Sequence, residues 1–419
     1  MRVLVVGSGA REHALCLSLA ADPVVSALIC APGNAGTAAV AEQRPLNVLD
    51  PVAVAALATQ SMADLVIIGP EAPLVAGVAD AVRAAGIACF GPSGVAAQLE
   101  GSKAFAKDVM AAAGVPTARS LLCRTVAQAE QALDTFGAPY VVKDDGLAAG
   151  KGVVVTTDRE VALRHAAECG QVVIEEYLSG PEVSVFCVTD GRTVVPLLPA
   201  QDFKRIFDGD AGPNTGGMGA YSPLDWLPEG TVDYVVRTVA QPTVAEMARR
   251  GTPFAGLLYI GLAMTAAGPR VIEFNARFGD PETQVVLALL DSPLAGLLYA
   301  AATGTLADQP PLQWRAAAAV TVVVAAANYP GSPRLDDAIM GGDQPGVIHA
   351  GTRRDADGVL RSSGGRVLSA TAVGDDLAEA RTAAYRLVES ISMPGAQRRT
   401  DIAWRAVNGD VQVPVSSAQ

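Results

Sequence analysis

The chain has 419 residues, of which 50% are hydrophobic, and a net charge of −12 at pH 7. This length predicts roughly three domains with buried cores. The acidic balance disfavours a general nucleic-acid surface, and the longest apolar run, 316–327, is shorter than a membrane span. We therefore expect no nucleic-acid partner and no membrane partner. The first residues lack the pattern of a secretory signal, so a cytoplasmic location is the default expectation.

The cysteines and lysines are informative by their spacing. The six cysteines lie far apart without a CxxC pair, which argues against zinc and disulfides and predicts reduced, mostly buried thiols. Of the 31 basic residues, five are lysines, all between 103 and 204. An ammonium binds phosphate oxygens without the planar geometry of a guanidinium, so the cluster predicts a phosphorylated ligand; chance clustering is the alternative. The five are Lys103, Lys107, Lys143, Lys151 and Lys204.

Residues 1–101 alternate strand-like and helix-like patterns. Helical patterns begin near Glu12 and near residue 75, and each lies between apolar, β-branched runs. This alternation predicts a doubly wound α/β domain with a parallel sheet. The expected strands are 2–7, 25–31, 63–69 and 86–91.

The first loop, VVGSGAREH, partly matches a dinucleotide-binding fingerprint. Glu12 stands in place of the third glycine, and no acidic residue for a ribose follows the second strand, so NAD binding is not expected. The backbone N–H groups at the start of the helix still suit a phosphate ester beside Gly9 and Arg11.

Two further loops follow the second and third strands, at the edge where open α/β sheets bind ligands. They are APGNAG, with Gly33 and Asn34, and GPEAPL, with Glu71. Glu71 is placed to accept hydrogen bonds from sugar hydroxyls. The alternative is that both loops are tight turns that need glycine and proline.

The segment 102–113 predicts a helix with Ser102 as its N-cap and an end at the GVP that follows. From about 117 to 190 we expect strands and one helix, at about 158–168. The loop DDGLAAGKGVVV (144–155) has the wrong glycine spacing for a P-loop, and its β-branched flanks predict that it joins two strands. Such a loop can cover phosphates as a lid, or it can be an ordinary glycine-rich turn.

Two segments with unusual charge come next. In VVIEEYLSGPEVSV (172–185) an apolar strand runs into carboxylates. Its backbone could contact an adenine and Glu182 could bind ribose hydroxyls; an acidic surface loop is the alternative. The loop 202–223 is rich in charge and glycine, which suits a substrate-binding segment.

The remaining elements follow from periodicity. After a helix at about 230–250 come strands at 253–265 and 270–275 and a helix from about 281. The last hundred residues predict a small α+β domain that ends in a loose tail from 413. Its expected strands are 318–326, 346–350 and 366–372, and its expected helix is 375–391.

The segment RVIEFNARFGDPE carries the clearest site. On a strand, Glu273 and Asn275 point to the same face and offer two hard oxygen ligands for magnesium held jointly with nucleotide phosphates. A salt-bridged strand carboxylate is the alternative, since an unpaired one is costly to bury. Arg277 could bind a carboxylate bidentately, and Asp280 with Glu282 could hold an ammonium group.

Together these motifs resemble the ATP-grasp ligases, and more closely the phosphoribosylamine–glycine ligase family over nearly the whole chain. The matching stretches are GSGAREHAL, APGNAGT, GPEAPLVAGV, AAQLEGSKAFAK, DGLAAGKGV, IEEYLSG, GPNTGGMGAYSP, IEFN, RFGDPETQ and GGRVL. The resemblance implies ATP-dependent ligation of glycine to 5-phosphoribosylamine in de novo purine biosynthesis, with glycyl phosphate as intermediate and ADP and phosphate as products. It also implies a lid subdomain that closes on the ATP phosphates.

By the same resemblance, roles are expected for particular residues. Glu273 and Asn275 would bind Mg²⁺ or Mn²⁺. Arg277, Asp280 and Lys204 would act in catalysis. Phosphoribosylamine would contact Gly9, Arg11, Gly33, Asn34 and Glu71. ATP would contact Lys103, Lys143, Lys151, Glu175, Glu176, Tyr177, Leu178, Glu182, Arg205 and Asn214.

The expected domains are an N-terminal α/β domain (1–101), an ATP-grasp domain (102–315) with its lid at about 117–190, and a C-terminal α+β domain (316–419). A monomer or a weak homodimer is expected. Another ATP-grasp ligase or carboxylase should lack the phosphosugar loops of the first hundred residues. A non-catalytic ATP sensor should lack Glu273 or Lys143, and both are present.

The chain departs from the family pattern at several positions. Phe203 stands where the family commonly has histidine, and Ala10, Asp144 and Ala276 replace a glycine, a small apolar residue and a cysteine. The stretch 166–177 is shorter than usual and lacks a glycine-containing lid loop. These changes bear on lid closure but leave the metal and lysine positions intact.

Overall fold

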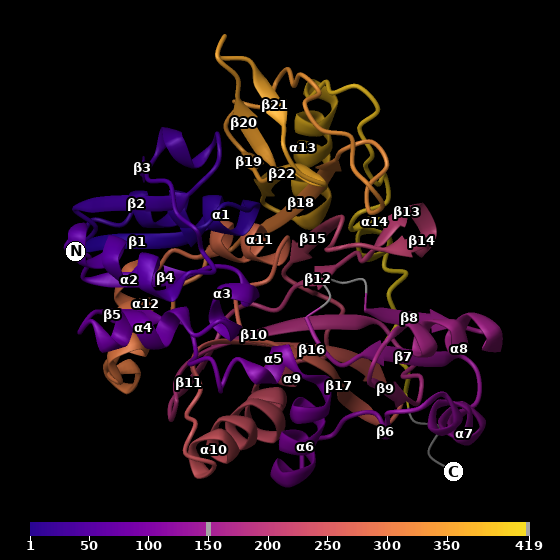
Figure 1. The fold of residues 1–419 in the computed structure, drawn as a ribbon. Coiled ribbons are helices and arrows are strands. Elements are labelled where there is room, and N and C mark those ends of the chain that lie inside the picture. Colours follow the sequence, from indigo (N-terminus) through magenta and orange to yellow (C-terminus); the bar gives the residue numbers. More distant parts are fainter. Residues whose placement is uncertain (148–151, 416–419) are drawn as a thin grey trace.

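The structure is a computed structural model, and it describes residues 1–147 and 152–415 (Figure 1). The chain forms three packed bodies around a long central sheet, with the N-terminal strands on the left of the view and the C-terminal domain at the top. The small lid lies at the lower right, beside the central sheet.

The N-terminal domain is a parallel sheet in the order β3-β2-β1-β4-β5, which confirms the predicted doubly wound unit. Residues of the central strand β1 alternate between the two sides of the sheet. Leu4 and Val6 pack with α2 and α4, whereas Val3 and Val5 pack with α1 and with α12 (Leu294–Thr303), which comes from much later in the chain. The elements are β1 (Arg2–Gly7), α1 (Ala10–Ala20), β2 (Ala27–Pro32), η1 (Thr37–Ala39), β3 (Glu42–Gln43), α2 (Pro51–Gln60), β4 (Leu65–Ile68), α3 (Glu71–Val75), α4 (Val78–Ala84) and β5 (Ala88–Phe90).

Helix α6 leads from this domain to the lid and confirms the predicted caps. Ser102 accepts a hydrogen bond from the backbone N–H of Phe105, and Gly114 ends the helix in the left-handed conformation. The lid is an antiparallel sheet in the order β6-β9-β7-β8. The elements are α5 (Gln98–Gly101), α6 (Lys103–Ala113), β6 (Ser120–Cys123), α7 (Val126–Phe136), β7 (Tyr140–Asp144), β8 (Val153–Thr156), α8 (Arg159–Glu168) and β9 (Val172–Glu175).

The prediction of one helix in the lid is wrong, because α7 is present as well as α8. Its signals are a threonine N-cap, Thr125, and an apolar stripe of Ala129, Ala132 and Leu133 at helical spacing. These residues pack with the inner faces of β7 and β9 in a core that belongs to the lid alone. The strand–loop–strand prediction is confirmed, because β7 and β8 pair antiparallel.

The central sheet is antiparallel, in the order β11-β10-β16-β17. The helix predicted at 230–250 is interrupted at Val236–Ala240 by a π-helical segment. Pro242 stands in the first turn of the next helix and lacks an N–H to donate, which fits a change of hydrogen-bond pattern there. The elements are β10 (Glu182–Asp190), β11 (Val194–Pro196), α9 (Thr231–Val235), η3 (Val236–Ala240), α10 (Gln241–Arg249), β16 (Ala255–Thr265), β17 (Gly268–Asn275), α11 (Glu282–Leu289), α12 (Leu294–Thr303) and η4 (Leu306–Asp308).

The C-terminal sheet has the order β12-β15-β18-β22-β19 and includes two strands from the segment before residue 230. Its centre, β18, is buried at every residue and confirms the strand predicted at 318–326. Helix α13 covers one face and α11 the other. The elements are β12 (Gln201–Asp202), β13 (Arg205–Phe207), η2 (Asp208–Asp210), β14 (Ala211–Asn214), β15 (Gly219–Ser222), β18 (Ala318–Ala325), β19 (Val347–His349), β20 (Thr352–Arg354), β21 (Leu360–Ser362), β22 (Arg366–Gly374), α13 (Leu377–Ser390) and α14 (Trp404–Val407).

The expected burial of most cysteines is confirmed. All six thiols are free, and five of them are buried. Within 1–147 and 152–415, no helix combines the length and the apolar character needed to cross a membrane.

Candidate active site

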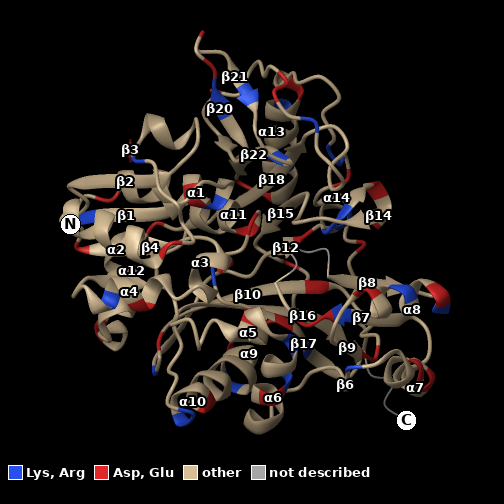
Figure 2. Cartoon of the chain, viewed as in Figure 1, with Lys and Arg blue, Asp and Glu red and all other residues tan. Residues whose placement is uncertain are grey.

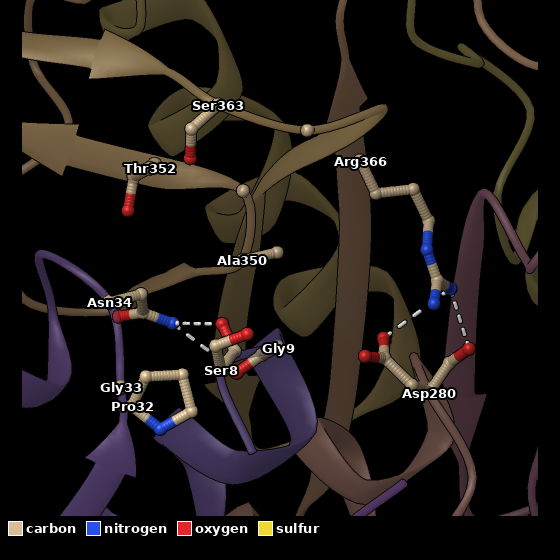
Figure 3. A pocket seen from close by; sticks show the side chains of 12 residues that line it. Ser8, Gly9, Pro32, Gly33, Asn34, Asp280, Ala350, Thr352, Ser363 and Arg366 are labelled. Atoms are coloured by element: carbon tan, nitrogen blue, oxygen red, sulfur yellow. Dashed lines mark hydrogen bonds and ion pairs between the residues drawn. The ribbon is translucent and has the colours of Figure 1, made fainter. Parts of the chain in front are cut away.

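Two adjoining cavities contain the predicted site residues. The larger, of about 1230 Å³, lies among the N-terminal loops, the lid, the central sheet and the segment 201–216. The smaller, of about 410 Å³, lies between the N-terminal loops and the β20–β21 region of the C-terminal domain (Figure 3). The two cavities share Ser8, Gly9, Pro32, Asp280 and Arg366.

Every predicted site residue that the structure describes lines one or both cavities. Gly33 and Asn34 line the smaller one, and Lys151 lies outside the described residues. In the view of Figure 2, basic and acidic residues are interspersed along the surrounding elements. The larger cavity is lined by Gly9, Arg11, Glu71, Lys103, Lys143, Glu175, Glu176, Tyr177, Leu178, Glu182, Lys204, Arg205, Asn214, Glu273, Asn275, Arg277 and Asp280.

The pair predicted to bind metal lies on β17. Glu273 and Asn275 flank the buried Phe274, so both side chains point away from the core. Burial favours the neutral form of Glu273. The ammonium groups of Lys204, Lys143 and Lys103, in order of decreasing effect, nevertheless hold the pKa of its carboxyl below the ordinary value. This carboxylate therefore stays ionised.

A divalent cation fits this pair if a ligand supplies further oxygens. One ionised carboxylate and one amide oxygen are hard donors, which suit magnesium. The described residues form no group of three or more His, Cys, Asp or Glu that could hold a metal by themselves. The donor set therefore matches an ion that is shared with the phosphates of a bound molecule.

Lys204 lies between carboxylates on two strands of the central sheet. Its Nζ is 2.7 Å from Oε2 of Glu182 and 3.8 Å from Oε1 of Glu273. Burial lowers the pKa of Lys204, but Asp202, Glu182 and Glu273 together raise it well above its usual value. Asp202, which the sequence interpretation missed, has a pKa raised to about 7 by burial, against the attraction of Lys204.

Two lysines share a buried carboxylate where the lid meets the central sheet. Glu175 lies with Oε2 2.9 Å from Nζ of Lys143 and Oε1 3.0 Å from Nζ of Lys107. Lys143 also donates to the carbonyl of Ile272 at 2.8 Å. Lys103 donates to the carbonyl of Gly146 in the lid loop. Lys107 was not assigned a role from the sequence, although it belongs to the lysine cluster.

Arg277 is held by the protein's own carboxylates. Its Nε is 3.2 Å from Glu71 and its Nη2 is 3.1 Å from Glu100. Burial raises the pKa of Glu71, but Arg277 and Arg11 hold it below the usual value. Glu100 was missed because its partner is far away in the sequence; it also accepts the backbone N–H of Ala276 at 2.7 Å.

Asp280 lines both cavities, and Figure 3 shows it beside Arg366 in the smaller one. Its carboxylate is 3.4 Å from Nη1 of Arg366 and accepts hydrogen bonds from the backbone N–H of Arg11 and from Gln284. Nη1 of Arg366 also donates to the carbonyls of Asp280 and Gly216, both at 2.6 Å. Arg366 was not predicted as a site residue, although its GGRVL motif was part of the resemblance.

The side chains of the N-terminal loops mostly hold the loops together. The carboxylate of Glu12 is buried, accepts the N–H of Gly9 at 2.5 Å and pairs with Arg11 at 2.6 Å. It thus lies between the first loop and Gly69, close to Gly7, Gly9 and Gly69. Asn34 donates to the carbonyls of Ser8 and His349, both at 2.9 Å, and so joins the N-terminal loop to the C-terminal domain.

The remaining predicted residues lie at the outer side of the larger cavity. Glu176 pairs with Arg119 in the lid at 2.6 Å, next to Tyr177 and Leu178. Arg205 donates to the carbonyl of Gly212, and Asn214 donates to the carbonyl of Val153 in the lid. The segment after α14 also reaches this cavity through Val411 and Gln412, which the sequence interpretation did not predict.

Sequence models of one family match most of the chain. The N domain of phosphoribosylglycinamide synthetase matches residues 1–100, its ATP-grasp (A) domain 101–283 and its C domain 319–405. The chain belongs to the phosphoribosylglycinamide synthetase family. It is therefore a ligase with the three-domain architecture of that family. The domain boundaries at 101 and 315 stay predictions.

Individual relatives agree with this membership. A phosphoribosylamine–glycine ligase from Streptomyces coelicolor is 67% identical. The alignment covers 97% of this chain and 99% of that relative. A phosphoribosylamine–glycine ligase from Mycobacterium leprae is 61% identical, and the alignment covers 99% of this chain and 100% of that relative. The crystal structure of the Thermotoga maritima enzyme of that name has a TM-score of 0.85 at 32% identity and covers 96% of this chain and 100% of its own. The structure of a biotin carboxylase from Campylobacter jejuni has a TM-score of 0.73 at 15% identity, and the superposition covers 98% of this chain and 97% of that carboxylase. At this identity the similarity shows a shared fold alone.

The substitution Gly69→Ala tests the packing around the buried carboxylate of Glu12. A Cβ on Gly69 would lie 1.9 Å from Oε1 of Glu12, which is buried and already paired. We expect a loss of about 1–3 kcal/mol in the free energy of unfolding by urea, relative to the matched variant Gly170→Ala. A Cβ on Gly170 meets nothing within 4 Å. Equal stability of the two variants would contradict this packing.

Proposed function

We propose that this ligase joins glycine to 5-phosphoribosylamine at the expense of ATP, in de novo purine biosynthesis, and releases ADP and phosphate. The observation that carries the proposal is the junction of two cavities at Asp280. One cavity contains lysines and the Glu273–Asn275 pair, which suit nucleotide phosphates. The other lies between the N-terminal and C-terminal domains and suits a phosphosugar. The names of the relatives support the same reaction.

We assign ATP to the larger cavity. Lys103 and Lys143 would contact its phosphates, and Lys151 would approach them from the lid loop. The segment 175–178 would contact the adenine and Glu182 the ribose, with Arg205 and Asn214 beside the phosphates. The charges support this assignment, because a polyanion in this cavity would find several ammonium groups at short range.

Glu273 and Asn275 would hold a magnesium ion, or manganese in its place, together with the ATP phosphates. Such an ion neutralises charge on the phosphoryl group during its transfer. The ionised state of Glu273 among three lysines supports this role.

We assign phosphoribosylamine to the smaller cavity, which the loops of Gly9 and Gly33 line, and to Glu71, which lines the adjoining larger cavity. The hydroxyls of Thr352 and Ser363 also line this cavity and can donate to a phosphate (Figure 3). Arg11 and Asn34 would act by fixing the loops, since their polar groups bind other parts of the protein.

Glycine would lie where the cavities meet. Its ammonium would face Asp280, and its carboxylate would share the guanidinium of Arg277 with Glu71. Support comes from the pKa of Asp280, which burial raises but which Arg366 and Arg11 hold below the usual value, so that the group remains an anion.

In the reaction, an oxygen of the glycine carboxylate attacks the γ-phosphorus and ADP leaves. The amine of phosphoribosylamine then attacks the acyl carbon of glycyl phosphate, loses a proton to the surroundings, and phosphate departs. Lys204, near Glu273 and Glu182, would balance charge on the transferred group. The lid would exclude the water that hydrolyses glycyl phosphate. Other ATP-grasp ligases, carboxylases and ATP sensors are not favoured, because family models match at both ends of the chain.

ADP release with glycine and phosphoribosylamine, supplied separately and together, tests the reaction. We expect ADP to form in amounts equal to the amide product when both are present, because each turnover consumes one ATP. ADP formation that is independent of phosphoribosylamine, or no ADP at all, would contradict the proposed function.

The substitution Glu273→Gln tests the metal assignment. We expect turnover to fall by about 100-fold or more, since one ionised metal ligand is lost, while the melting temperature stays close to that of the original chain. The magnesium dependence of ADP binding, measured by calorimetry, should weaken as well. Glu42→Gln, at an exposed glutamate paired with Arg44, is the control. Turnover of Glu273→Gln at the control level would refute the assignment.

A further inference from the structure

Lys107 is the one described lysine without a role in the proposed function. It lies on α6, and three oxygen atoms surround its ammonium group. Nζ donates to Oγ1 of Thr117 at 2.9 Å and to the carbonyl of Ala118 at 3.0 Å, and it lies 3.0 Å from Oε1 of Glu175. Two of its three N–H bonds are thus used in hydrogen bonds, and the ammonium also forms an ion pair with Oε1 of Glu175, which has no hydrogen-bond partner among the described residues, so protein oxygens surround Lys107.

Lys143 is held less completely. Among the described residues, its Nζ contacts two oxygen atoms, the carbonyl of Ile272 at 2.8 Å and Oε2 of Glu175 at 2.9 Å. Within 1–147 and 152–415, these contacts leave one N–H of Lys143 for a bound anion. Both lysines line the larger cavity, but Lys143 lies on β7, the strand that leads into the lid loop.

The carboxylate of Glu175 decides how tightly Lys143 is held. Its side chain is 3% exposed, so its charge is little screened by water. In the structure this charge is divided between two ammonium groups. Without Lys107, Lys143 alone would neutralise it, and an ammonium in a tight buried pair is less able to bind phosphate.

We propose that Lys107 is a positioning residue for the nucleotide: it shares the charge of Glu175 and thereby keeps the ammonium of Lys143 available to the ATP phosphates. This inference rests on the proposed function, because it takes the anion at Lys143 to be a nucleotide phosphate. Lysine suits this position because its point charge meets three oxygens at once, whereas a guanidinium is planar. It also gives a reason for a lysine in a chain that otherwise uses arginine.

A double-mutant cycle on the full chain tests the proposal, with the Kd for ADP in the presence of magnesium measured by calorimetry. Lys107→Met should weaken ADP binding by about tenfold. In the Glu175→Gln background, the same substitution should change the Kd by less than about twofold, because no charge remains to capture Lys143. Equal effects of Lys107→Met in both backgrounds would overturn the proposal.

Two further variants separate positioning from loss of folding. Lys107→Arg keeps the positive charge and should bind ADP at least about threefold more tightly than Lys107→Met; an equal loss would contradict the charge argument. Asp108→Asn is the control, since Asp108 is the next residue on α6 but pairs outward with Arg250. It should leave the Kd unchanged.

Steady-state kinetics give an independent readout. For Lys107→Met we expect the KM for ATP to rise about tenfold while the KM values for glycine and phosphoribosylamine stay within about twofold. A loss of kcat with all KM values unchanged would indicate a purely structural role and would refute the inference. If the original chain binds ADP tightly but shows no ligase turnover, the proposed function is refuted. The double-mutant cycle still tests the role of Lys107, because it measures the Kd for ADP and not turnover.

Discussion

Ionised side chains in the walls of the larger cavity must be paired, because an isolated charge is costly to remove from water. The chain satisfies this requirement with partners that lie far apart in the sequence. Arg277 is bound by Glu71 and by Glu100, both from the first 101 residues, and Asp280 is bound by Arg366 from the C-terminal domain. The same pairs that neutralise these charges therefore hold the domains around the cavity. We infer that ligands enter a site whose charges are already positioned, which favours catalysis by electrostatic stabilisation.

Local patterns predicted most of the elements, and long-range pairing explains the missed site residue Glu100 and the missed strands β12 and β15. Ser102 and Gly114 marked the ends of α6, and the spacing of Glu273 and Asn275 placed both on one face of β17. The helix α7 was missed although Thr125 and its apolar stripe were present in the sequence. Glu100 carries no local sign of its role, because its partners follow about 175 residues later in the chain, at a distance set by the fold. The strands β12 and β15 likewise join a sheet whose centre lies beyond residue 317.

The departures from the family pattern have local explanations at two places. Phe203 packs beneath the guanidinium of Arg399, with Cζ 4.9 Å from the ring centroid, so an aromatic contact with the C-terminal domain stands where histidine is common. In the shortened stretch near 168–172, Gln171 donates to Asp145, whose carboxylate also accepts a hydrogen bond from Ser102 at the start of α6. The short turn is thus tied to the helix that carries Lys103 and Lys107. Nothing in the structure explains why alanine replaces cysteine at Ala276.

The central claim is that glycine is activated by transfer of the γ-phosphoryl group, because the lysines and the Glu273–Asn275 pair are assigned to the phosphates of ATP. Turnover with glycine labelled by heavy oxygen in its carboxylate tests this claim most directly. The account predicts that one labelled oxygen per turnover appears in inorganic phosphate, with ADP as the sole nucleotide product. Label in AMP, or unlabelled phosphate, would contradict it, since an adenylate would then carry the activated glycine.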